Sequence, residues 1–122
     1  MLPLRTTLVL AILSSPAVAD DWQVLTGDAI TQALTARAVA YPGGQTQTFH
    51  ADGRTLYQSD QPQWGQWRVE GDRYCSVWPP SDRWSCCHVE GEARGLDLRF
   101  VTGGGTLTQG RYVDLHQPGP SH

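Results

Sequence analysis

Hydrophobic and polar residues follow two different periods along this chain. Apolar residues recur at helical spacing from Ile30 to Leu34, and the acceptor side chains of Thr26 and Asp28 stand just before them or at their start. This pattern predicts one short helix from about Asp28 to Ala36, with Ile30 and Leu34 facing the core and Thr26 or Asp28 capping the first turn. After the helix the period changes to two, which is typical of half-buried β-strands.

Turn signals divide the period-two region into short segments. Asp52-Gly53, Gly71-Asp72 and Pro79-Pro80 lie between such segments, and these dipeptides mark tight turns. Strands are expected at 38–41, 46–50, 54–58, 64–70, 73–78, 84–89 and 96–102, followed by 106–109 and 111–115. The fold class is therefore mainly β: an antiparallel meander of about eight short strands, either a small barrel or a curled sheet, with one short N-terminal helix.

Residues 1–19 are typical of a secretory signal peptide. Arg5 gives a positive start, 6–15 form an apolar run too short to span a bilayer, and Ala17-Val18-Ala19 fits a cleavage site. We expect a mature protein that begins at Asp20 and is periplasmic or secreted, in an oxidising space. It would form one β-rich domain over 20–116, followed by a disordered tail over 117–122.

Arginine supplies all nine basic residues, because the chain contains no lysine. Loss of Arg5 with the signal leaves eight arginines against twelve acidic residues, a net charge of −4. Mild acidity without a basic run argues against nucleic acid as a partner. No second apolar run reaches membrane-spanning length, so we expect no stable membrane insertion after processing.

Motifs of common catalytic sites are absent from the sequence. It contains neither a nucleophile elbow, nor a paired-histidine zinc motif, nor a phosphate loop. Asp52, Asp72 and Asp82 fall in predicted turns, where carboxylates bind the local backbone. The cysteines and His88 lack the paired spacing of zinc sites. We therefore predict no enzymatic activity, no cofactor and no metal site.

The three cysteines surround a proline turn. Cys75 precedes Pro79-Pro80, and Cys86 and Cys87 follow it. Opposed residues of antiparallel strands have Cα atoms within disulfide distance, so Cys75 can form a bond across this hairpin. Cys86 and Cys87 point to opposite faces of their strand, so only one of them suits Cys75. Local packing leaves both pairings open.

The segment around the cysteines is similar to a known family. It reads Gly65-x-Trp67-x-Val69-x-Gly71-Asp72-x-Tyr74-Cys75-Ser76-x-Trp78-Pro79-Pro80-Ser81-x-x-Trp84-x-Cys86, with Asp52-Gly53-x-Thr55 and Leu25-Thr26-Gly27 upstream and Phe100 downstream. The chain resembles a family of small secreted bacterial proteins of unknown function. The position of Cys87 looks like an aromatic site in that family, so the resemblance implies a Cys75–Cys86 disulfide and a free Cys87. It implies no catalytic residues.

Tryptophan and arginine gather near the proline turn. Trp78, Arg83 and Trp84 lie there, and these residue types are enriched at binding hot spots. The sequence therefore predicts a non-enzymatic binding or accessory domain for a protein, peptide or glycan, with these three residues as its contact surface. The alternative is a carrier that holds a small apolar ligand inside a barrel, lined by Phe49, Leu56, Trp67 and Leu98.

Overall fold

The computed structural model describes residues 21–113. The predicted signal peptide and its cleavage site after Ala19, and the predicted tail over 117–122, lie outside the described residues. The elements, in chain order, are β1 (Trp22–Val24), α1 (Gly27–Leu34), β2 (Arg37–Ala40), β3 (Thr46–Phe49), β4 (Arg54–Gln58), β5 (Pro62–Glu70), β6 (Arg73–Val77), β7 (Ser85–Glu92), β8 (Asp97–Val101) and β9 (Leu107–Val113).

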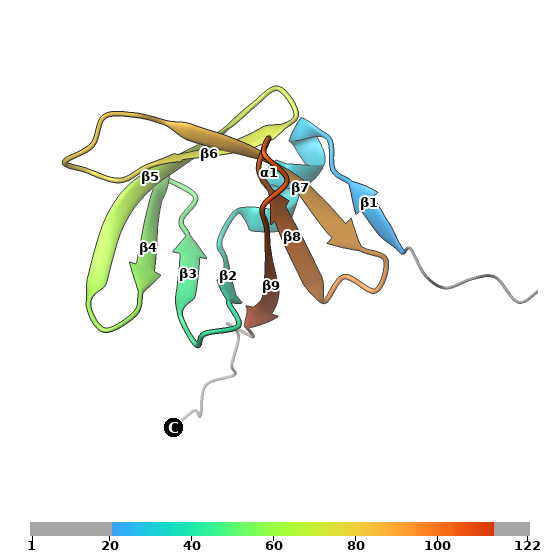
Figure 1. The fold of residues 1–122 in the computed structure, drawn as a ribbon, viewed down its shortest axis with the longest axis horizontal. Coiled ribbons are helices and arrows are strands. Elements are labelled where there is room, and N and C mark those ends of the chain that lie inside the picture. Colours follow the sequence, from blue (N-terminus) through green and yellow to red (C-terminus); the bar gives the residue numbers. More distant parts are fainter. Residues whose placement is uncertain (1–20, 114–122) are drawn as a thin grey trace, which may run out of the picture.

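Strands β2 to β9 form a closed antiparallel barrel. Each strand pairs with the next along the chain, and β9 returns to pair with β2 (Figure 1). The short strand β1 adds to β7, beyond the point where β6 begins, with Trp22 opposite Glu92 and Val24 opposite Glu90. The predicted fold class, a mainly β antiparallel meander with one short helix, is confirmed.

Helix α1 covers one end of the barrel. In Figure 1 it lies opposite the β2–β3 and β4–β5 turns. Ile30 and Leu34 have no exposed surface, as their helical spacing predicts. They pack into a core with these buried residues of the barrel: Val39, Phe49, Trp67, Tyr74, Val89, Leu98 and Phe100. The helix ends at Leu34, before the predicted Ala36, because Ala36 adopts φ 60° and donates its N–H to the carbonyl of Phe49.

The first turn of α1 is capped from a distant segment, and the predicted local cap is wrong. Thr26 occupies the N-cap position, but its side chain makes no capping hydrogen bond. Instead, the Gly27 N–H donates to Oδ1 of Asp72 at 2.7 Å, from the turn between β5 and β6. A Cβ on Gly27 would lie 2.3 Å from the carbonyl oxygen of Gly71, so only glycine allows this close approach.

One strand was not predicted, and one strand prediction is wrong. β1 was not expected, because three residues are too few to show a period. The last two predicted strands form one strand, β9, which runs through Gly110. Gly110 pairs with Leu98, and a Cβ there would lie 3.3 Å from side-chain atoms of Val39 and Tyr41. This glycine therefore allows close packing inside the barrel and does not break the strand.

Cys75 and Cys86 form the disulfide that the family resemblance implies. They are direct register partners on β6 and β7, with Cα atoms 4.0 Å apart. Their flanking residues Tyr74 and Ser76 face the barrel interior, so by alternation the disulfide lies on the outer face. Cys87 is a free thiol on the inner face, opposite Tyr74.

Across 21–113, no helix has the length and apolar character needed to cross a membrane.

Candidate functional site

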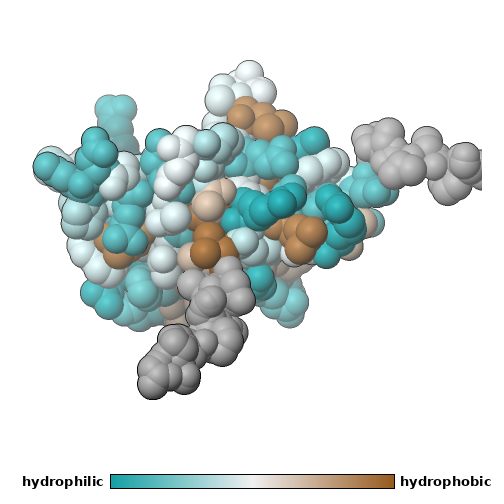
Figure 2. Space-filling model, turned by 90° about the horizontal axis from the view of Figure 1, so that it is seen from below, coloured by the Kyte–Doolittle hydropathy of each residue, from teal (hydrophilic) through white to brown (hydrophobic). Residues whose placement is uncertain are grey.

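The barrel end opposite α1 contains a cavity of about 540 Å³, which we call the mouth cavity. It draws side chains from all barrel strands except β7, or from the turns beside them. The lining residues are Tyr41, Pro42, Gln45, Gln47, Tyr57, Gln63, Tyr74, Ser76, Trp78, Phe100 and Thr108. Five of the eleven are aromatic and none is charged. Figure 2 views the molecule from the side of the β2–β3 and β4–β5 turns, where the surface is mainly hydrophilic with small separate hydrophobic patches.

Trp78 forms one wall of the mouth cavity because the chain leaves the sheet after β6. Proline lacks an N–H for the strand ladder, and Pro79-Pro80 follows directly. The Trp78 indole lies against Gly65, where a Cβ would be only 2.6 Å from the ring. Its ring centroid is 6.1 Å from that of Tyr57, in an edge-on arrangement. Glycine at position 65 therefore gives the indole its place inside the barrel.

Aromatic contacts join the mouth cavity to the packed core. The ring centroid of Tyr41 lies 6.3 Å from that of Tyr57 and 6.2 Å from that of Phe100. Phe100 in turn meets Tyr74 edge-on at 5.5 Å and stacks with Phe49 at 6.4 Å. Such pairs hold one another's orientation, so the cavity wall is fixed by the core beneath it.

A buried glutamine organises the polar groups at the cavity floor. Gln47 is only 6% exposed. The Thr55 hydroxyl donates to the carbonyl of Thr48 at 2.8 Å, so its oxygen is left to accept a hydrogen bond from Gln47. Gln47 Nε2 donates to Thr55 Oγ1 at 3.0 Å and to the Tyr74 hydroxyl oxygen at 3.2 Å. Gln47 Oε1 accepts a hydrogen bond from the Tyr41 hydroxyl at 2.7 Å.

The two phenols that contact Gln47 stay protonated at neutral pH. Burial raises the pKa of Tyr74 to about 12. Burial also raises the pKa of Tyr41, and the neighbouring phenols add to this effect. Desolvation disfavours the charged form of an acid, so both hydroxyls keep their hydrogens for bonding.

The structure separates the three residues of the predicted contact surface. Trp78 lines the mouth cavity, inside the barrel. Trp84 is half-buried on the outer face, where the guanidinium carbon of Arg68 lies 3.8 Å from its ring centroid. Arg83 is exposed, and its backbone N–H donates to Ser81 Oγ. A contact role for these residues stays a prediction, but Trp78 and Trp84 lie on opposite sides of the barrel wall.

The predicted lining of a carrier cavity is wrong in each of its four residues. Phe49, Trp67 and Leu98 belong to the packed core near α1. Leu56 pairs with Thr48 and Trp64 on the outer face, because the neighbouring Thr55 and Tyr57 point inward. Several residues that line the mouth cavity instead carry polar groups, which usually face solvent, so the sequence analysis did not place them inside the barrel. Gln47 is the main example. The available signal was parity: Gln47 shares the strand face of Phe49.

Within residues 21–113, one group of side chains of metal-ligating types lies close together, but its sulfur atoms are already bonded. Glu70, Cys75 and Cys86 have possible ligand atoms within 4.8 Å of one another. Both sulfurs are joined in the disulfide, so neither is a thiolate that could bind a metal.

Comparisons with protein-family models, with curated proteins and with solved structures found no match. The likeness of the cysteine-containing segment to a secreted family stays a prediction. The fold and the cavity define the class: a closed eight-stranded barrel with an uncharged, aromatic cavity in its mouth.

Proposed function

We propose that the mature chain is a secreted or periplasmic, non-enzymatic domain that binds one small uncharged ligand in the mouth cavity. This places binding inside the barrel, as in the carrier alternative, and not on the predicted outer surface. The observation that carries the proposal is the cavity of about 540 Å³ with five aromatic and no charged lining residues.

Size and chemistry both support a small neutral ligand. Cavities of roughly 300 to 1,000 Å³ are typical of small-molecule sites, and eight strands give a barrel interior able to hold one such molecule. Burial of a charged group without a partner is costly, and this lining offers no opposite charge. Anions are therefore disfavoured.

Two further observations support the non-enzymatic and extracytoplasmic parts of the proposal. The buried phenols of Tyr41 and Tyr74 have raised pKa values and exchange protons poorly near neutral pH, which suits binding better than acid–base catalysis. The Cys75–Cys86 disulfide fits an oxidising compartment.

A matched pair of dyes tests the proposal. N-phenylnaphthylamine is neutral, and anilinonaphthalene sulfonate is the same skeleton with one negative charge. We expect the neutral dye to bind with increased emission, and the sulfonate to bind at least about tenfold more weakly because its charge would be desolvated without a partner. Fluorescence titration of the protein over residues 20–122 measures both.

Variants locate the dye. Trp78→Ala removes one wall and should weaken the neutral dye by about tenfold, since a large aromatic contact is lost. Trp84→Ala, the same change on the outer face, is the control and should leave the affinity unchanged. Equal binding of both dyes, or a loss in Trp84→Ala alone, would contradict a neutral site in the mouth cavity.

A further inference from the structure

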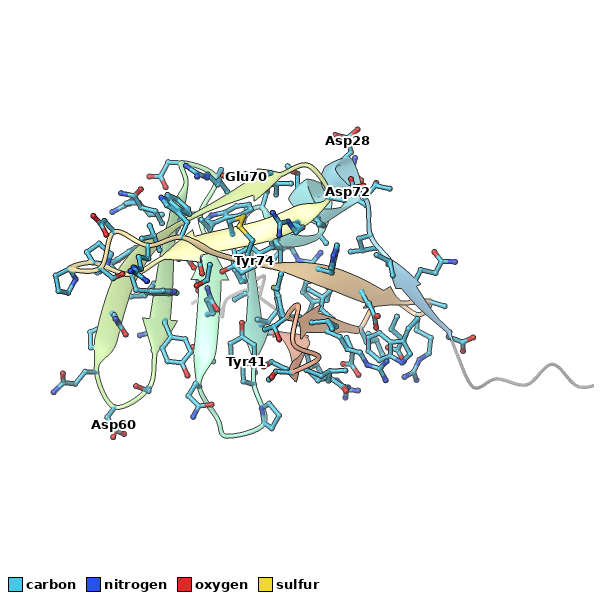
Figure 3. The ribbon with its side chains drawn as sticks, turned by 45° about the horizontal axis from the view of Figure 1, so that its top comes forward. Asp28, Tyr41, Asp60, Glu70, Asp72 and Tyr74 are labelled. Atoms are coloured by element: carbon cyan, nitrogen blue, oxygen red, sulfur yellow. A yellow bond between two sulfur atoms is a disulfide. The ribbon has the colours of Figure 1, made fainter. Side chains whose placement is uncertain are left out.

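The Gln47 amide is bracketed by two hydroxyls that still have hydrogen-bonding capacity. The Tyr41 hydroxyl donates its hydrogen to Gln47 Oε1, so the Tyr41 oxygen keeps its lone pairs and can accept a hydrogen bond. Tyr74 receives an N–H from Gln47 on its oxygen, so this bond does not use the Tyr74 hydrogen. Figure 3 labels both tyrosines, which come from opposite parts of the barrel wall, after β2 and on β6.

The Tyr74 hydroxyl keeps its hydrogen as a donor. Tyr74 accepts an N–H from Gln47, and the nearby Ser76 Oγ accepts the Trp78 Nε1–H at 3.2 Å. Neither bond uses a hydroxyl hydrogen, so each of these two hydroxyls retains one. Both side chains line the mouth cavity, so the Tyr74 hydrogen is available to a ligand there.

We propose that the mouth cavity selects a flat, uncharged molecule that carries a carbonyl and an N–H side by side on one edge, as a cyclic amide does. This inference rests on the proposed function. The ligand carbonyl would accept the hydrogen of the Tyr74 hydroxyl, and the ligand N–H would donate to the Tyr41 oxygen.

The geometry favours an amide edge over a lone carbonyl or a lone N–H. Tyr41 and Tyr74 already bond the two ends of one amide, that of Gln47, and so are spaced to bond a second amide on the cavity side. The result is a closed ring of hydrogen bonds: Gln47 to Tyr74, Tyr74 to the ligand, the ligand to Tyr41, and Tyr41 to Gln47. Hydrogen bonds linked in this way polarise and strengthen one another.

A cyclic amide fits this ring better than an open one. Its ring holds the N–H and the carbonyl on the same edge, so no internal rotation between these two groups is lost on binding. Its flat face can pack against the aromatic walls of Tyr57 and Trp78, which meet edge-on at the side of the cavity.

Three flat bicyclic probes test the inference by calorimetry. Carbostyril is a cyclic amide, N-methylcarbostyril has a methyl group in place of the N–H hydrogen, and naphthalene lacks both polar groups. We expect carbostyril to bind roughly fivefold to tenfold more tightly than its N-methyl derivative, the usual effect of one hydrogen bond. Naphthalene should bind more weakly than carbostyril by at least the same factor.

Variants assign the effect to the proposed groups. Tyr41→Phe removes the acceptor for the ligand N–H. Carbostyril and its N-methyl derivative should then bind equally, because Gln47 Oε1 lies behind the lost hydroxyl by the length of one hydrogen bond and is too far from the ligand N–H to replace it. Tyr112→Phe is the matched control: the Tyr112 hydroxyl donates to the Ala33 carbonyl and does not line the mouth cavity, so this variant should keep the preference. Melting temperatures of both variants identify any general loss of folding.

Each outcome has a distinct meaning. A preference for carbostyril that Tyr41→Phe abolishes supports the inference. Equal binding of all three probes, with the neutral dye still bound, overturns the amide edge but leaves the proposed binding of small neutral ligands. Failure of all three probes and of the neutral dye overturns both.

Discussion

Arginine on the outer face of this barrel serves as a stacking partner for tryptophan. The pairs are Arg68 with Trp84, Arg99 with Trp22 and Arg54 with Trp64, with the guanidinium carbon 3.8, 3.8 and 4.8 Å from the ring centroid. A planar guanidinium stacks on an aromatic face and is more weakly hydrated than an ammonium. The absence of lysine from the sequence is consistent with this use of its basic residues.

The Cys75–Cys86 bond gives a prediction at the residue scale. It closes a short loop, with a sequence separation of 11, and a loop of that size stabilises by about 3 kcal/mol in the chain-entropy model. The double variant Cys75→Ala, Cys86→Ala should therefore lower the free energy of unfolding by about 3 kcal/mol, measured by urea denaturation without reductant.

A single variant and a reductant are the controls for the disulfide. Reductant should destabilise the natural chain but not the double variant. Cys87→Ala should retain the response to reductant, because Cys87 is the free thiol on the inner face. If Cys87→Ala abolished that response, the bond in solution would involve Cys87 and the register of β6 and β7 would differ.

At the scale of elements, α1 depends on the β5–β6 turn for its cap. Replacing Asp72 with Ala removes the acceptor for the Gly27 N–H, and loss of such a cap costs about 1 kcal/mol. Asp72→Ala should lower the free energy of unfolding by this amount and speed amide exchange in the first turn of α1. Asp72→Asn keeps an oxygen acceptor at the same place and should retain most of the stability.

If Asp72→Ala and Asp72→Asn were equally destabilised, the charge and not the hydrogen bond would be the important feature. If neither changed the exchange rates in α1, the helix would be held by Ile30 and Leu34 alone.

The sequence predicted the elements that its local patterns specify. Helical spacing located Ile30 and Leu34, and the Asp52-Gly53 and Gly71-Asp72 turns separated strands whose bounds are nearly those observed. Features that depend on distant partners were missed. β1 exists through its bonds to β7, the cap of α1 comes from Asp72, and Gly110 packs against Val39 across the barrel.

The candidate site was missed for the same reason. The pairing of β9 with β2 closes the barrel and creates the mouth cavity, and no local sequence pattern predicts that pairing. Trp78 was singled out, but its position inside the barrel depends on Gly65 of a neighbouring strand. Gln47 was not singled out, because a lone glutamine in a strand usually faces solvent.

At the scale of the whole molecule, one barrel has two unlike ends. Ile30 and Leu34 of α1 fill one end together with the core aromatics, and this packing supplies stability. The other end keeps open space among residues that the core holds in place. Phe100 and Tyr74 belong to both regions, so the cavity wall and the folded state are linked.

This link predicts that the fold is sensitive to alkali through the cavity floor. Burial raises the pKa of Tyr74 from 10.0 to about 12, so the folded chain holds this proton more tightly than the unfolded chain does. The stability that this provides is fully present below pH 10.0 and is lost as the pH rises through about 12. A shift of that size corresponds to about 3 kcal/mol.

Urea denaturation across this pH range, followed by circular dichroism, measures the effect. The free energy of unfolding of the natural chain should fall steeply between pH 10.0 and about 12. In Tyr74→Phe the hydrogen bond to Gln47 is lost at every pH, so the variant starts less stable, by about 1 kcal/mol. Its further fall in alkali should be smaller by about 3 kcal/mol, with a remainder from Tyr41, whose pKa burial also raises. Parallel curves for the two proteins would show that Tyr74 ionises as readily in the folded chain as in the unfolded one.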